Sequence, residues 1–386
     1  MTTEETAVEQ VRKEKNYGML MPREEAQVSM VYEHLGVAGA PPETLQGYED
    51  NDTGNARRFL DVYGDDVRYC AGEKQWYICQ PDMSWKVDEE LLVEKLACES
   101  VHNSYAHELQ FYRAIDRFGQ MKGTVSKLER GLRNIGNLSV LKSCIGMAQK
   151  EVPITADSFD RYDNLFHMPN AIFDVETLSC VANRKEYYIT RTAGAEYDCE
   201  AECPRWEQFV MECVEGDIGL YRYLQKAAGY SVLTGDISEQ VVFCLLGSGK
   251  NGKSLFINTL AEIAGDYANK IEASVLCTNR FGDKDNDMSK ELYRIKGSRF
   301  VYSNEFGRSS VLNENFIKTI TDGGKIACRP LYGASIEYKP SYTLWFSTNH
   351  MPNLAAMDEG IRRRVMVIPF RNNLTEAQID RTLADK

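Results

Sequence analysis

The stretch Val241-Val-Phe-Cys-Leu-Leu-Gly-Ser-Gly-Lys-Asn-Gly-Lys-Ser254 decides the fold of this 386-residue chain. Its first six residues are apolar, which is typical of a strand buried on both faces of a parallel sheet. The next eight fit the pattern G-x-x-x-x-G-K-[ST], and an apolar helical pattern follows from Leu255 until Gly265. A strand, a glycine-rich loop and a helix in this order predict a P-loop nucleotide-binding domain.

The residue types of the loop match the chemistry of a bound nucleoside triphosphate. Glycine lets backbone N–H groups approach phosphate oxygens without a Cβ clash, and the following helix N-terminus favours an anion. Lys253 is expected to contact the β- and γ-phosphates, and the Ser254 hydroxyl to ligate Mg²⁺. The residues predicted to bind the nucleotide are Gly247, Ser248, Gly249, Lys250, Asn251, Gly252, Lys253 and Ser254.

Two later apolar strands are predicted to end in polar residues that would serve the same site. Residues 299–305 end in Glu305, a carboxylate that could polarise the attacking water near Mg²⁺, although Asn304 stands where an aspartate is usual. Residues 342–349 end in Asn349, whose amide could bond the γ-phosphate or orient the water. An Asx-turn that caps the strand before Pro352 is the structural alternative for Asn349.

Three consecutive arginines, Arg362, Arg363 and Arg364, follow Asp358-Glu-Gly-Ile361. They cannot share one helix face, so some are expected to point away from their own domain. An arginine finger that acts on a neighbouring subunit is one use for such a residue. A surface cluster of salt bridges is the alternative.

Composition sets limits on the class of protein. The chain has 45 Lys+Arg and 57 Asp+Glu, a net charge of −12, and its 43% hydrophobic residues are ordinary for a globular protein. No apolar run reaches the roughly 20 residues of a membrane helix, and the N-terminus has no secretory signal, so no membrane partner and a cytoplasmic location are expected. The 11 cysteines are scattered, which indicates reduced thiols; the pair Cys199 and Cys203 lacks the further close ligands of a zinc site.

One basic segment stands out in this acidic chain. Residues 111–150 hold eight basic and two acidic side chains, a local charge of +6. Such a segment is either a solvated helical surface or a nucleic-acid surface, and the sequence leaves both open.

These segments together resemble the superfamily 3 helicases, in particular the phage/plasmid primase-helicase (poxvirus-primase-like) family. The resemblance spans about residues 50–375. Its carrying segments are residues 247–254, 297–305, 321–333, 344–352 and 358–370, preceded by 51–59, 76–85, 164–177 and 203–206.

The resemblance implies an α/β fold with an AAA+-like P-loop ATPase core, in which helices flank a central parallel sheet. An α+β N-terminal domain and a helical collar would precede the core. The expected limits are 1–50 for a leader and linker, 51–202 for the pre-helicase domain, 203–236 for the collar, and 237–386 for an ATPase domain with a truncated C-terminal part.

The resemblance also implies an ATP hydrolase with ATP and Mg²⁺ as cofactors: a homo-hexameric ring that unwinds DNA during replication of a phage, plasmid or other mobile element. Its partners would be single-stranded or forked DNA, further copies of the chain, and a replication initiator or primase. An ATP-switched DNA-binding scaffold or origin-recognition ring is the alternative. The implied catalytic residues are Lys253, Glu305, Asn349, Arg363 and Arg364; the Mg²⁺ ligands are Ser254 and Glu305; the DNA contacts, on a pore hairpin at 325–339, are Lys325, Arg329 and Lys339.

Overall fold

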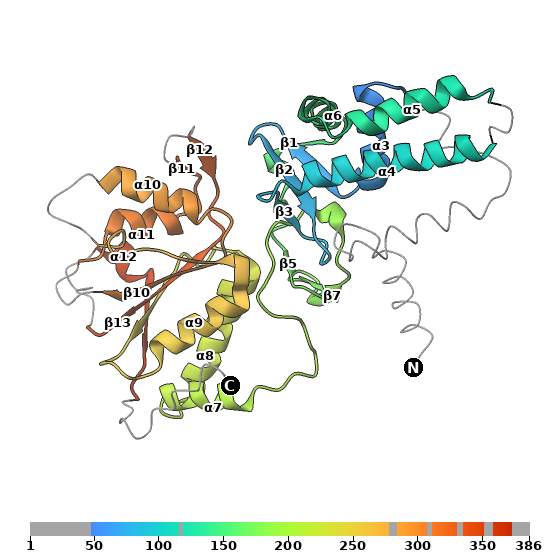
Figure 1. Cartoon of the computed structure of the whole chain (residues 1–386). Helices are drawn as coiled ribbons and strands as arrows, with labels where there is room; N and C mark the ends of the chain where they lie inside the picture. Colours follow the sequence, from blue (N-terminus) through green and yellow to red (C-terminus); the bar gives the residue numbers. More distant parts are fainter. Residues whose placement is uncertain are drawn as a thin grey trace. The chain divides into compact units, whose positions relative to one another are not determined.

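The computed structural model describes residues 48–115, 119–277, 284–306, 311–329, 335–350 and 358–372, and within these ranges it leaves out the side chains of 115, 284–287 and 304–306. The chain divides into two compact units (Figure 1). The first comprises residues up to Arg161 with Arg184–Thr190, and the second comprises Tyr162–Asn183 and everything from Arg191 onward. The predicted leader therefore lies almost wholly outside the described residues, and the limits at 202 and 236 stay predictions.

The first unit is α+β, as predicted. Its helices cover one small sheet with the strand order β3-β2-β1-β4, in which β1 pairs antiparallel with β2 and parallel with β4. Asn51 begins the first helix, because its side chain accepts a hydrogen bond from the backbone N–H of Gly54. The elements are α3 (Asp52–Tyr63), β1 (Val67–Cys70), β2 (Gln75–Cys79), β3 (Trp85–Val87), α4 (Leu92–Ile115), α5 (Lys122–Asn134), α6 (Leu138–Glu151), β4 (Pro153–Ile154) and the short 3-10 turns Ala156–Ser158 and Lys185–Tyr187.

The second unit is built on a five-stranded parallel sheet with the order β14-β8-β13-β10-β9. The strands are β8 (Val242–Leu246), β9 (Ala268–Lys270), β10 (Phe300–Phe306), β13 (Thr343–Thr348) and β14 (Val365–Pro369). The strand that leads into the glycine loop, β8, is thus internal. The strand that ends before Asn349 lies between β8 and the strand that carries Glu305. This arrangement confirms the predicted α/β, AAA+-like core.

Both faces of this sheet are covered by helices, which is why β8 and β13 are buried along almost their whole length. On one face Val242, Cys244 and Phe346 join the core of α10 and α11; on the other Phe243 and Trp345 pack with α7, α8 and α9 (Figure 1). The helices are α7 (Pro204–Cys213), α8 (Ile218–Gly229) with a π turn at Tyr230–Thr234, α9 (Lys253–Ala264) with a 3-10 turn at Gly265–Tyr267, α10 (Lys284–Arg294), α11 (Glu314–Thr321) and α12 (Glu359–Arg362).

Two small antiparallel sheets complete the second unit: β5 (Leu165–His167), β6 (Ile172–Asp174) and β7 (Ser179–Val181), and the hairpin of β11 (Ile326–Cys328) and β12 (Ile336–Tyr338). Buried Arg299 connects the first of these to the core, since its guanidinium donates to the carbonyl oxygens of Leu165 and Asp163. In the ranges that the structure describes, every helix is too short or too polar to cross a membrane.

Candidate nucleotide-binding site

The glycine loop between β8 and α9 has the backbone shape that its sequence predicts. Gly249 and Gly252 have φ angles of +107° and +85°, in the left-handed region that glycine tolerates best. A Cβ at Gly252 would also lie 2.6 Å from the Cys213 sulfur and 2.8 Å from the Phe209 ring. The loop therefore lies directly on helix α7.

Gly247 meets a second constraint, which comes from inside the loop. A Cβ there would lie 1.8 Å from the Asn251 amide nitrogen and 2.5 Å from the Phe370 carbonyl oxygen. Asn251 is 2% exposed and donates to that same carbonyl oxygen over 3.2 Å. Asn251 thus fastens the middle of the loop to the end of β14, a role that the motif alone does not assign.

Lys253 is the first residue of α9 and is buried. Its ammonium donates to the Gly247 carbonyl oxygen (2.7 Å), to the Asn251 side-chain oxygen (2.8 Å) and to the Asn349 side-chain oxygen (3.1 Å). All three of these acceptors are neutral, so they hold the ammonium in place without cancelling its attraction for a phosphate. This geometry fits the ATP that the motif implies.

Asn349 reaches Lys253 because of the strand register. β13 pairs in parallel with β8, and Thr348 stands opposite Leu246, so both chains leave the sheet at the same edge. The structure thereby brings together Lys253 and Asn349, which are 96 positions apart in the sequence. The contact uses the Asn349 side-chain oxygen, the atom that an Asx-turn would also use, and residue 351 of such a turn lies outside the described residues.

The predicted magnesium ligands lie at the same edge. Ser254 is exposed in the first turn of α9, beside Lys253. Glu305 lies on β10, where the pairing with β13 passes from Ser303 opposite Phe346 to Phe306 opposite Thr348. That shift is a bulge at Asn304 and Glu305, whose side chains lie outside the described residues. Bulges of this kind are common beside active sites.

Two cysteines beneath the loop take no part in chemistry of their own. Burial raises the pKa of Cys213 and that of Cys244 to about 12, although the Lys253 charge opposes this rise at Cys244. Both are therefore neutral packing groups at physiological pH. Elsewhere in the described ranges, no three His, Cys, Asp or Glu side chains gather as metal ligands, and Cys199 and Cys203 are exposed and free.

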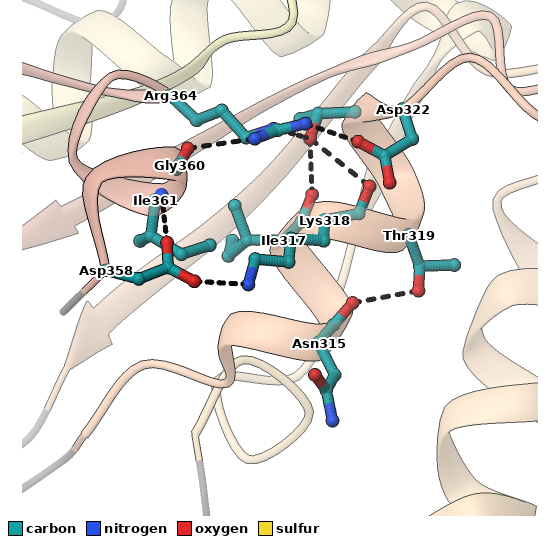
Figure 2. A network of polar contacts seen from close by, with 10 residues as sticks. Asn315, Ile317, Lys318, Thr319, Asp322, Asp358, Gly360, Ile361 and Arg364 are labelled. Atoms are coloured by element: carbon teal, nitrogen blue, oxygen red, sulfur yellow. Dashed lines mark hydrogen bonds and ion pairs between the residues drawn. The ribbon is translucent and has the colours of Figure 1, made fainter.

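The arginine segment separates into exposed and buried members. Arg362 and Arg363 are exposed, whereas Arg364 is only 7% exposed. The Arg364 guanidinium donates to the Thr321 hydroxyl (2.9 Å) and the Gly360 carbonyl oxygen (2.9 Å), and it pairs with the Asp322 carboxylate (Figure 2). The Arg364 guanidinium is thus bound on three sides within its own unit, and its role as an arginine finger stays a prediction.

A second ion pair joins the same two helices. Lys318 of α11 pairs with Asp358 over 2.5 Å, and the other Asp358 oxygen accepts from the Ile361 backbone N–H as the N-cap of α12 (Figure 2). The hydrogen bond from Lys318 lowers the pKa of Asp358. Sequence reasoning missed both Asp322 and Asp358. The available signal was Asp358 immediately before a short helical segment, a typical N-cap position.

The predicted hairpin is present, and its turn at 330–334 lies outside the described residues. Ile326 pairs with Tyr338, so Lys325 and Lys339 lie together at the open base of the hairpin, and Arg329 lies where β11 leads into the turn. All three side chains are exposed, and the Arg329 backbone N–H donates to the Ser289 hydroxyl. The three predicted DNA contacts are therefore distributed over both ends of the hairpin.

Comparison with known proteins finds two separate family matches along the chain. Residues 56–215 match the family model "D5 N terminal like", and residues 245–364, from the glycine loop to Arg364, match a "Family of unknown function (DUF5906)". "Putative helicase L207/L206" of Acanthamoeba polyphaga mimivirus is 26% identical over 78% of this chain and 32% of its own length. The chain is thus similar, in the segments that carry its motifs, to viral proteins named as putative helicases.

Further relatives have similar names. "Putative primase C962R" of African swine fever virus is 28% identical over 33% of this chain and 13% of its own length. Among solved structures, the apo structure of the NrS-1 C terminal region aligns with 86% of this chain and 65% of that chain, at 12% identity and a TM-score of 0.49. The chain spans about a third or less of the length of the viral relatives that it matches.

Proposed function

We propose that this chain is an ATP-dependent replicative DNA helicase of a virus or other mobile element, which hydrolyses ATP at the subunit interfaces of a hexameric ring. The observation that carries the proposal is the contact between Lys253 and Asn349. It joins the phosphate-binding cation to a neutral amide at the carboxyl edge of a parallel sheet, where such folds bind ligands.

ATP would bind with its phosphates against the backbone N–H groups of the loop and the N-terminus of α9. Lys253 would then turn from the Gly247, Asn251 and Asn349 oxygens toward the β- and γ-phosphates. Asn349, released from the ammonium, would orient the attacking water. Ser254 and Glu305 would hold Mg²⁺, which supplies charge neutralisation at the transferred phosphoryl group.

The positive charge beside the γ-phosphate would come from Arg363 of a neighbouring subunit. Arg363 is exposed, whereas Arg364 is bound within its own unit. Arg364 would act as a positioning residue that fixes the turn after α12 onto the end of α11. The hairpin at 325–339 begins four residues after Thr321, at the end of α11. The contact of Arg364 with the end of α11 would therefore transmit nucleotide binding at the subunit interface to the DNA contacts at Lys325, Arg329 and Lys339.

The test measures DNA-stimulated ATPase activity of Lys253→Ala, Arg363→Ala and their mixture, with Arg362→Ala as the matched exposed control. Each of the first two variants should lose about 10³-fold or more of kcat. In an equal mixture, about a quarter of head-to-tail interfaces combine an intact lysine with an intact arginine, so about a quarter of the wild-type rate should return. A mixture as inactive as its components would refute the shared site. If Arg362→Ala lost activity and Arg363→Ala did not, Arg362 would be the arginine finger.

The scaffold alternative is favoured by one feature, the Asn304 that stands where an aspartate usually binds the metal. A switch protein with slow hydrolysis would still assemble with ATP. Strand displacement on a forked duplex separates the two functions: ATP-dependent unwinding supports the helicase, and nucleotide-dependent assembly without unwinding supports the scaffold.

A further inference from the structure

Helix α5 of the first unit exposes a cationic face that the nucleotide site does not use. Its exposed basic residues are Lys122, Lys127, Arg130 and Arg133. At 100° per residue, these positions fall within an arc of about 140° and extend over about 16 Å of the helix axis. We call these four residues the α5 basic face.

The opposite side of α5 fixes the direction of this face. Leu128 is buried in the core of the unit, and Gly131 lies so close to α4 that a Cβ there would be 2.4 Å from the Tyr105 ring. Figure 1 shows α5 lying alongside α4. Packing therefore holds the basic face toward solvent as a rigid row of cations.

The acidic side chain of α5 does not neutralise this face. Glu129 is the one acidic residue of α5, and Arg113 of α4 already pairs with it over 2.6 Å. None of the four cations of the face forms an ion pair with any other residue that the structure describes. The helix thus carries four cations and one carboxylate, a net charge of +3, in a chain of net charge −12.

The composition of the face selects among anionic partners. The arc contains Gly123, Ser126 and Asn134 between the cations and no apolar or aromatic side chain. It therefore lacks the aromatic side chains on which single-stranded bases stack. It also lacks the apolar side chains that insert into a lipid surface or form the centre of a protein interface. What it offers is charge and hydrogen-bond donors, which suit the phosphate backbone of a duplex whose bases are already stacked.

We infer that the α5 basic face binds the sugar-phosphate backbone of duplex DNA without reading its sequence. This inference rests on the proposed function and adds a DNA contact in the first unit, apart from the hairpin. In a helicase, such a contact would hold the duplex that is still to be opened.

The test is a salt titration of duplex binding by the full chain without nucleotide. The variant carries Lys122→Gln, Lys127→Gln, Arg130→Gln and Arg133→Gln. Each phosphate contact contributes about −0.9 to the slope of log K against log salt, so the slope should become less steep by about 3 to 4. The matched control replaces Arg57, Lys74, Lys95 and Arg184 by Gln, four exposed cations of the same unit, and its slope should stay near that of the wild type.

Three results would overturn the inference. They are equal slopes in wild type and α5 variant, equal losses in the α5 and control variants, and a larger loss for single-stranded than for duplex DNA. The Lys253→Ala protein should retain the full duplex slope. If the wild-type chain showed no ATPase activity but bound duplex through α5, the proposed function would be refuted and this inference would stand.

Discussion

Arg364 and Arg363 are adjacent in sequence, yet we expect only the replacement of Arg364 to lower the stability of the second unit. Arg364→Ala removes a guanidinium that bonds Thr321, Gly360 and Asp322. Breaking a buried ion pair costs about 3–5 kcal/mol, but the Asp322 side chain is 54% exposed and can rehydrate once the arginine is gone. We therefore expect a loss of about 2–3 kcal/mol in the free energy of unfolding.

Thermal unfolding measures this loss. For a unit of this size, each kcal/mol corresponds to about 2–4 °C, so the transition of the second unit should fall by about 5–10 °C. Arg363→Ala should stay within about 0.5 kcal/mol of wild type, as expected for an exposed residue. A double-mutant cycle with Asp322→Asn should give a coupling energy of the order of 1 kcal/mol.

One outcome would refute the reasoning. If Arg364→Ala unfolds like the wild type, and its lost ATPase activity returns on mixing with Lys253→Ala subunits, then Arg364 acts in trans. Its three contacts within the unit would then be incidental. Melting curves and mixing assays on the same preparations separate the two roles.

Two further predictions follow from the same unit. Gly252→Ala should lower both the melting temperature and the nucleotide affinity, because it places a Cβ at φ +85° against Cys213 and Phe209. Gly324→Ala is the control, since a Cβ there meets no neighbour and should change neither quantity. Calorimetry measures the melting temperature, and nucleotide titration measures the affinity. Asp358→Asn should be less stable than wild type at neutral pH. Because Lys318 lowers the pKa of Asp358 in the folded state, the contribution is present above the unfolded pKa of about 3.9 and is lost as pH falls through the lower folded value. The melting difference between the two proteins should therefore vanish in acid; a difference that persists there would contradict the ion-pair explanation.

The sequence by itself determined the elements that form the glycine loop of the second unit. The apolar run before Gly247 and the spacing of Gly252, Lys253 and Ser254 specify a buried strand, a turn of left-handed glycines and a helix start. These are local properties, set by backbone sterics and hydrophobic periodicity within about 20 residues, so they can be predicted from the sequence without knowledge of the fold.

Only the tertiary structure decided which side chains meet. Asn349 reaches Lys253 because β13 inserts beside β8, and no local pattern encodes that strand order. Likewise, the repeated Arg362-Arg-Arg364 gives no sign that the third residue is buried. Its burial depends on Thr321 and Asp322, more than 40 positions away, which lie at the end of a helix packed on the same sheet. Spacing along the chain predicts elements, but contact between distant elements depends on register and packing, which only the folded chain fixes.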